Sequence, residues 1–202
     1  MFKITDMTNK FFVAAAAAMI LFSTQAFAQI GVGAGFNNTT VKTESSLGDT
    51  SYGAPGIYFG IDFTQELSFG FSTTGGLVYT ACSIDRNSKR RSEQAINIPL
   101  SLNYGLEIDP EIRGILSTGP VFGLCTVSRY ITDDNFYFNN FKEKDLGRFK
   151  FQWNIGVGAE LMGRYRFNIG YAFGLNNRNK SKSVPGTVKN NDLHVGVAYL
   201  FW

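Results

Sequence analysis

The sequence predicts an all-β protein, namely an eight-stranded antiparallel up-and-down transmembrane β-barrel. Three observations lead to this fold. Apolar residues alternate with small or polar residues in eight separate segments. The connections between these segments are alternately short and long. The longest uninterrupted apolar run, residues 11–22, is too short for a membrane-spanning helix, so any membrane character must be spread through the alternating segments.

The first 28 residues predict a secretory signal peptide. Lys3 and Lys10 give a positive start, the apolar run follows, and Ala26-Phe27-Ala28 forms an A-x-A cleavage site. The barrel domain is therefore expected to cover residues 29–202. A retained membrane anchor is the less favoured alternative, because the apolar run is short and ends in Ser23 and Thr24.

The first four predicted strands each place apolar residues at every second position. In 30–36 Ile, Val, Ala and Phe alternate with Gly, and in 57–63 Ile and Phe occupy the odd positions. The alternation is looser in 67–79, which begins with Leu and two Phe. It is regular again in 96–106, where Ile, Leu and Tyr share one face.

The last four predicted strands follow the same rule with one irregular member. Segment 113–126 contains Pro120, which lacks a ladder donor, so a bend or bulge is expected there. Segment 149–161 alternates most clearly, with Phe, Trp, Ile and Val against Lys, Gln, Asn and Gly. Aromatic and aliphatic residues alternate likewise in 165–175 and 193–201.

The predicted connections indicate the orientation of the barrel. Residues 64–66, 107–111 and 162–164 are expected to form tight turns, while 37–55, 80–94, 127–148 and 176–192 are expected to form long polar loops. Outer-membrane barrels have short periplasmic turns, long external loops and an even number of strands. The predicted localisation is the cell outer membrane, with outer-membrane lipid around the wall.

A secreted soluble barrel of the lipocalin type is the main alternative, because it also alternates along eight strands. The polar face of such a barrel would meet water and would be rich in Lys and Glu. Here that face consists mostly of Gly, Ser, Asn and Ala, which suit a narrow lumen. Aromatic residues gather near the strand ends, as in the interfacial girdles of membrane barrels.

The composition excludes several kinds of chemistry. Without Lys3, Asp6 and Lys10, the 19 basic and 16 acidic residues leave a nearly neutral chain, which implies no nucleic-acid partner. His194 is the only histidine, and no Cys/His cluster has the spacing of a metal site, so neither metal nor cofactor is expected. For Cys82 and Cys125, a disulfide formed after export and two free thiols are both open.

Two sets of charged residues stand out. A turn centred on Gly163 would place Glu160 opposite Arg166 on the lumen face, as an ion pair that fills the barrel. Arg86, Lys89, Arg90 and Arg91 form a basic loop patch that could contact lipopolysaccharide phosphates, although a solvated loop is the simpler interpretation.

The second half of the chain resembles the outer-membrane protein β-barrel family that includes PorT-like proteins. Ile96-Asn97-Ile98-Pro99-Leu100 is similar to its I-x-I-P-L strand, and Thr118-Gly119-Pro120 to the strand that follows. Residues 155–161, Arg166-Phe167 and residues 171–176 are similar to its G-x-G-x-E-L hairpin and G-L-x-N strand end. The resemblance implies the fold and the outer membrane. Family members have varied roles, one of them in a protein-secretion apparatus.

The last strand contains the expected signal for the barrel-insertion machinery. Such barrels commonly end in a lipid-facing aromatic residue, and here the lipid-facing positions are Tyr199 and Phe201, with Trp202 one step beyond. Either Phe201 is the signal, or a bulge returns Trp202 to that face.

The sequence favours a non-enzymatic barrel of structural or interaction type, with its function in the external loops and lipopolysaccharide or a protein as partner. An accessory component of a secretion or transport machine is the alternative. A lipid-modifying enzyme is less favoured, because Gly196 occupies the position of the serine in the His-x-Ser arrangement of lipid-A deacylase barrels.

Overall fold

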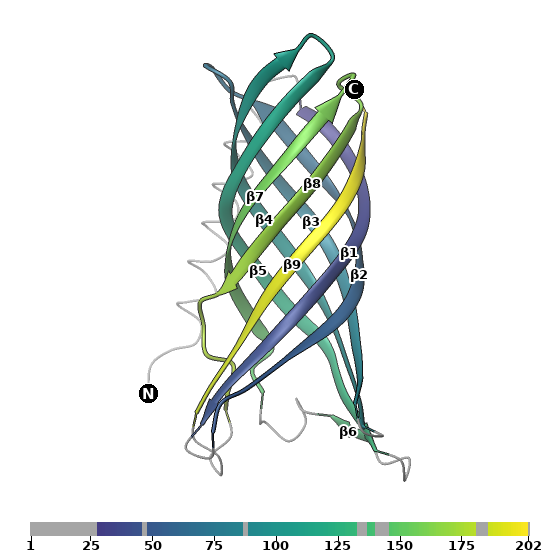
Figure 1. Cartoon of the computed structure of the whole chain (residues 1–202), viewed down its shortest axis with the longest axis vertical. Coiled ribbons are helices and arrows are strands. Elements are labelled where there is room, and N and C mark those ends of the chain that lie inside the picture. Colours follow the sequence, from purple (N-terminus) through teal and green to yellow (C-terminus); the bar gives the residue numbers. More distant parts are fainter. Residues whose placement is uncertain are drawn as a thin grey trace, which may run out of the picture.

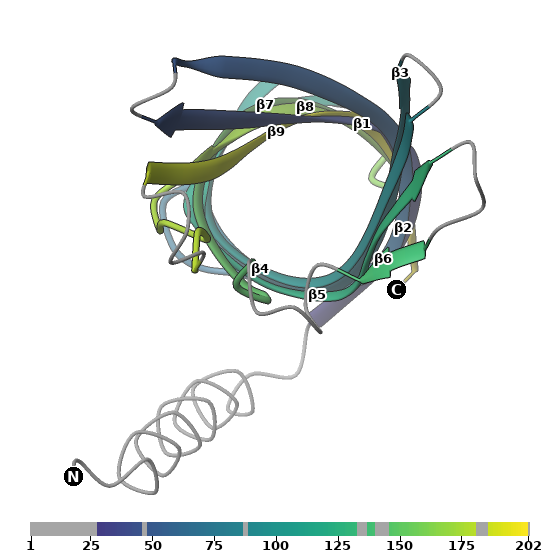
Figure 2. The same cartoon turned by 90° about the horizontal axis from the view of Figure 1, so that it is seen from below.

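A computed structural model describes residues 28–45, 48–86, 89–132, 137–139, 146–180 and 186–201. The chain forms a closed antiparallel barrel whose strands run obliquely to its long axis (Figure 1) and enclose a single lumen (Figure 2). Eight strands form the wall, and a ninth, β6, is a short addition to β5. The strands are β1 Ala28–Ser45, β2 Thr50–Glu66, β3 Phe71–Arg86, β4 Lys89–Asp109, β5 Ile112–Thr132, β6 Tyr137–Asn139, β7 Phe149–Leu161, β8 Tyr165–Gly174 and β9 Gly186–Phe201.

Each wall strand pairs with its neighbours in sequence, and β1 pairs with β9 to close the ring. This is the predicted up-and-down order, and it confirms the eight-stranded barrel. Closure leaves no free edge in the part of the wall that crosses the membrane, so the backbone groups there are paired. Within the described residues, no helix has the length and apolar character to cross a membrane.

The two faces of the wall have opposite chemistry, as the alternation predicts. Large apolar side chains point outward and are exposed on every wall strand, while polar side chains point inward and are buried. In β7, for example, Trp153, Ile155 and Val157 face outward, and Gln152 and Asn154 face the lumen. An outward apolar belt around a polar interior is the arrangement of a membrane barrel.

The short turns and both ends of the described barrel lie together, at the top of Figure 1. The turn predicted at 162–164 is confirmed, with Gly163 and Met162 at positive φ. The turn predicted at 64–66 is wrong. β2 continues to Glu66, and the chain reverses at residues 67–70, where Phe69 and Gly70 have φ of 62° and 79°. The apolar alternation continues through Leu67 without a break, so it does not mark this turn. The turn is defined by the backbone conformation of its residues.

The predicted loops 37–55 and 80–94 are mostly strand, and the predicted loops 127–148 and 176–192 are strand in part. β1 continues to Ser45, nine residues beyond Phe36, and β3 and β4 are joined across residues 87–88 alone. Polar residues at these outer ends suggested loops, but ladder pairing to neighbouring strands overrides that composition. The basic patch is therefore placed at the ends of β3 and β4 rather than in a loop, and the side chains of Arg86, Lys89, Arg90 and Arg91 lie outside the described residues.

The outer strand ends form two separate sheets (Figure 1). The pairing of β2 with β3 stops at Gly56 and Cys82, and beyond it the strands diverge. We call the β9–β1–β2 part, residues 186–191, 39–45 and 50–55, outer sheet A. The β3–β4–β5–β6 part, residues 83–86, 89–94, 125–132 and 137–139, is outer sheet B.

The irregularity expected in the fifth strand is present in its pairing with β4. The described pairs skip Gly119 and Pro120, and a register shift leaves Thr126 as an extra residue in β5. At the other end of the chain, Phe201 is exposed and pairs with Ile30 of β1. The expected insertion signal is thus lipid-facing at Tyr199 and Phe201, and Trp202 lies outside the described residues.

Candidate functional site: the charged lumen

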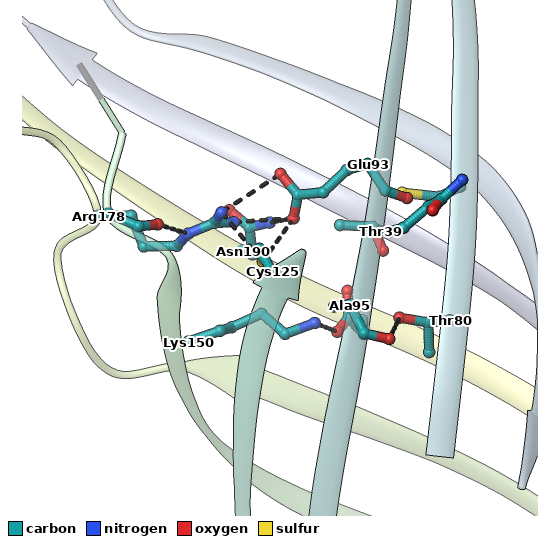
Figure 3. Close-up of polar contacts among 12 residues, drawn as sticks. Thr39, Thr80, Glu93, Ala95, Cys125, Lys150, Arg178 and Asn190 are labelled. Atoms are coloured by element: carbon teal, nitrogen blue, oxygen red, sulfur yellow. Dashed lines mark hydrogen bonds and ion pairs between the residues drawn. The ribbon is translucent and has the colours of Figure 1, made fainter. Parts of the chain in front are cut away.

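The lumen contains two ion-pair clusters, one near each end, with a cavity between them. The outer cluster lies toward the long hairpins and centres on Arg178 (Figure 3). Its guanidinium donates to both carboxylate oxygens of Glu93, at 2.9 and 3.3 Å. It also donates to the backbone oxygen of Gly147 at 3.0 Å and contacts the Cys125 sulfur at 3.1 Å.

Arg178 reaches this position because the segment after β8 folds back against the barrel mouth. We call residues 175–180 the strap. The Arg178 N–H donates to the oxygen of Val188 at 2.9 Å, and the Gly147 N–H donates to the oxygen of Arg178 at 2.6 Å. The Asn177 side chain accepts from the N–H groups of Asn179 and Val188, both at 2.9 Å. These bonds hold the strap between β9 and the start of β7.

The Arg178 side chain is 0% exposed, and that of Glu93 is 8% exposed. Burial lowers the pKa of Arg178, but the charges of Glu93 and its neighbours raise this pKa by more, so the net shift is upward. The guanidinium therefore keeps its charge. A buried charge without a partner is costly, so the bidentate contact is what makes this position tolerable.

A second ion pair lies beside the first in the outer cluster. The Lys150 ammonium and an Asp192 carboxylate oxygen are 2.8 Å apart, and both side chains are almost fully buried. The Gln152 amide donates to the same oxygen of Asp192 and to the backbone oxygen of Asn190, both at 2.9 Å. Asn190 in turn donates to Glu93 at 3.2 Å, which joins the two pairs into one network.

The inner cluster lies near the short turns. Arg166 contacts Glu160 at 2.7 Å and Asp62 at 3.2 Å. Arg113 makes a bidentate contact with Glu66, at 2.6 and 3.1 Å, and lies 3.8 Å from Glu160. This cluster is wetter than the outer one, because the side chains of Arg113 and Glu66 are 25% and 52% exposed.

Between the clusters lies a cavity of about 230 Å³ with both polar and apolar residues in its lining. Four carbonyl or carboxylate oxygens on residues that line it are buried without a hydrogen-bond partner within the described chain. They belong to Asn37, Asn97, Asn154 and Asp192. All four are acceptors that face a cavity large enough to hold ordered water.

His194 also lines this cavity, on the lumen face, as the alternation predicts. Its ring packs edge-on against Tyr58, with centroids 6.2 Å apart, and Tyr58 donates to Asn168 at 3.1 Å. Gly196 makes this packing possible, because a Cβ at that position would collide with the Tyr58 hydroxyl. The residue that replaces the serine of a deacylase motif thus has a packing role here.

The structure brings together some of the predicted residues and not others. Glu160 and Arg166 lie opposite each other in the β7–β8 ladder and form the expected lumen ion pair. Cys82 and Cys125 are both free thiols, which is one of the two open alternatives. Within the described residues, no group of three His, Cys, Asp or Glu side chains has the arrangement of a metal site.

Most of the outer cluster is not apparent from the sequence. Lys150 lies on the polar face of the predicted strand 149–161, but its partner Asp192 lies at the end of the predicted loop 176–192. Glu93 and Arg178 also lie in predicted loops, and they are separated by 85 residues. One signal was available: charged residues on the lumen parity of a strand require counter-charges inside the barrel.

Comparison with known proteins establishes the family. The family model described as outer membrane protein beta-barrel domain matches residues 14–201. This chain belongs to that family. Membership and the observed fold together place the protein in the outer membrane. No curated protein was found to match the sequence.

Solved structures share the fold at low identity. Neisserial surface protein A is 16% identical with a TM-score of 0.51, and the match covers 87% of this chain and 100% of that protein. Ail of Yersinia pestis is 11% identical with a TM-score of 0.49 over the same fractions. OprG of Pseudomonas aeruginosa is 10% identical with a TM-score of 0.43, covering 86% of this chain and 96% of that protein.

Proposed function

We propose that this barrel is an interaction protein of the outer membrane, and that outer sheets A and B bind its partner. The observation that carries the proposal is the extension of the strands well beyond the apolar belt as two distinct sheets. Such projections expose backbone and polar side chains to the outside of the cell, where a protein or a polysaccharide can reach them.

The lumen supports a binding role rather than a transport role. An eight-stranded barrel is filled by its own side chains, and here two ion-pair clusters occupy the interior near its two ends. The buried Arg178 and Glu93 pair also joins the strap to outer sheet B, and the backbone bond to Val188 joins the strap to outer sheet A. A rigid base favours binding, because less order is lost when a partner docks.

The edge of outer sheet A carries a feature of natural strand edges. Pro55 lies in the part of β2 that has left β3, and proline is found mainly where a strand has no partner on its N–H side. Proline at an exposed edge also discourages uncontrolled pairing with other chains. This favours recognition through the faces and tips of the sheets over open-ended strand addition.

The proposal is tested by trimming the sheets without changing the barrel. Residues 42–51 and residues 84–91 are each replaced by Asn-Gly, which joins the paired positions 41 and 52 or 83 and 92 through a tight turn. Heat-modifiable migration on gels reports whether each trimmed barrel has folded. Proteins cross-linked to the intact barrel at the cell surface should be lost from the trimmed forms. Unchanged cross-links on the doubly trimmed, folded barrel would refute the proposal.

The basic patch at the ends of β3 and β4 is proposed as a contact for lipopolysaccharide within outer sheet B. Its four positively charged residues suit phosphate groups. Neutralising Arg86, Lys89, Arg90 and Arg91 together should weaken binding of lipopolysaccharide to the purified barrel. If binding is unaltered, the patch is only a solvated hairpin.

A role as accessory of a secretion or transport machine is the second candidate. The segments that resemble PorT-like proteins fall in β4, β5, β7 and β8, which are neighbours in the barrel, so they form one continuous side of the wall. A pull-down that recovers stoichiometric periplasmic or secretion partners, independent of the outer sheets, would favour this candidate over the first. For the enzymatic alternative, unchanged outer-membrane lipid composition in His194→Ala cells would argue against it.

A further inference from the structure

Two lysines face each other on the outward surface of outer sheet A. Lys42 of β1 and Lys189 of β9 are directly paired in the β1–β9 ladder, and both are exposed. Directly opposite residues in an antiparallel sheet have Cβ atoms about 5 Å apart, and like charges in this position destabilise the pair. Such a pairing therefore calls for an anion that both ammonium groups can share.

The described residues of the protein do not supply that anion. Within the described residues, neither ammonium has a carboxylate within 4.0 Å, although several other lumen and turn cations do. Asp192 of β9 faces inward to Lys150, which leaves Glu44 as the one acidic side chain on the outward face of the described parts of β1 and β9. The two lysines thus carry an excess of positive charge on this face.

The position of the pair relative to the apolar belt indicates the ligand. Phe36 is the last large apolar residue on the outward face of β1 and is 74% exposed, and Leu193 and Val195 lie beside it on β9. Lys42 is six residues beyond Phe36. At about 3.3 Å per residue and a tilt of about 40°, this is about 15 Å above the edge of the belt. An extended lysine side chain from that height reaches the phosphorylated headgroup and inner core of an outer-leaflet glycolipid.

The surface between the belt and the lysines is suited to a sugar. Asn38 and Thr40 occupy the outward positions of β1 between Phe36 and Lys42, and Asn38 is exposed. Amide and hydroxyl groups at these positions can exchange hydrogen bonds with sugar hydroxyls. The outward face of β1 and β9 thus runs from acyl-chain contacts, through sugar contacts, to a pair of phosphate-binding charges.

We propose that Lys42 and Lys189 together bind a phosphate of lipopolysaccharide in the outer leaflet. This ligand would be a membrane lipid bound by outer sheet A. The inference rests on the proposed function only in that the two lysines lie on this sheet. It is separate from the basic patch of outer sheet B, which lies on other strands.

The test compares binding of lipopolysaccharide with binding of its dephosphorylated form to the purified, folded barrel. The Lys42→Gln/Lys189→Gln double variant should bind lipopolysaccharide about tenfold more weakly, which is the loss expected for two partly exposed charges. Its binding of the dephosphorylated form should match that of the unaltered protein. Lys42→Arg/Lys189→Arg should retain phosphate binding, because the charges remain. Glu44→Gln should strengthen it by removing the one acid on this face.

Arg164→Gln is the matched control, since it removes an exposed positive charge from a short turn at the opposite end of the barrel. It should leave lipopolysaccharide binding unchanged. Inositol hexakisphosphate serves as a soluble polyanion without acyl chains. The proposal would be overturned if the double glutamine variant bound lipopolysaccharide as tightly as the unaltered protein does. It would also be overturned if the unaltered protein bound inositol hexakisphosphate as tightly as lipopolysaccharide and lost that binding in the double glutamine variant. Because these variants keep both sheets intact, the result is independent of the trimming experiment.

Discussion

Charged side chains inside the barrel need partners of opposite charge, and the two ends of the lumen provide these partners in different ways. At the inner end, Glu160 and Arg166 face each other across a three-residue turn, and the neighbouring Glu66 remains half exposed. At the outer end, Glu93 and Arg178 are 85 residues apart in the sequence, and their side chains are 8% and 0% exposed. Local register alone therefore places the Glu160–Arg166 pair, whose side chains are 9% and 12% exposed, while the Glu93–Arg178 pair requires the closed barrel and the strap.

The largest effect is expected from Arg178→Met, which leaves the Glu93 carboxylate buried without its bidentate partner. Breaking a buried ion pair on one side costs about 3–5 kcal/mol, and we expect a loss of this size in the free energy of unfolding in lipid vesicles. Adding Glu93→Gln to the same chain removes the uncompensated charge and should restore part of the loss. A double variant that is less stable than Arg178→Met would contradict the assigned pairing.

A smaller loss is expected from Lys150→Met at the second outer pair. Asp192 would lose its cation but keep the hydrogen bond from Gln152, so the cost should be about 2–3 kcal/mol. Urea titration of the folded barrel in vesicles measures it. A loss below about 1 kcal/mol would mean that water reaches Asp192 and that the outer cluster is not dry.

The smallest effect is expected from Glu66→Gln at the inner cluster. Its side chain is 52% exposed, and exposed ion pairs contribute about 0–1 kcal/mol. The same titration should therefore show almost no change, and any change should vanish in high salt because exposed charges are screened. A loss as large as that of Arg178→Met would abolish the contrast between the two ends.

Much of the fold follows from the sequence, because each strand places an apolar, lipid-facing residue at every second position. The alternation in 149–161 located β7, and the tight turn at Gly163 fixed the register that brings Glu160 to Arg166. The two-residue period separates the side chains of each strand into two faces, and the surrounding membrane determines that the apolar face points outward. The same two-residue period places His194 on the lumen face of β9, where it lines the cavity.

The outer end could not be predicted in this way. Outside the membrane both faces of a strand meet water or polar side chains, so the alternation fades and residues 39–45 resemble a loop. Arg178 lies in a segment without regular structure. The position of its side chain in the lumen depends on backbone hydrogen bonds to Gly147 and Val188, which no local sequence pattern predicts. Contacts across such sequence distances are decided by barrel closure.

The most direct test of this contrast is the reactivity of Cys125, whose thiol is free, 0% exposed and in contact with Arg178. In a Cys82→Ser background, the folded barrel in vesicles is treated with a small water-soluble maleimide and labelling is followed over time. We expect no labelling of the parent protein, rapid labelling after Arg178→Ala and none after Arg113→Ala. Labelling of the parent at the rate of the unfolded chain, or equal labelling of the two arginine variants, would contradict a mouth sealed by the outer cluster.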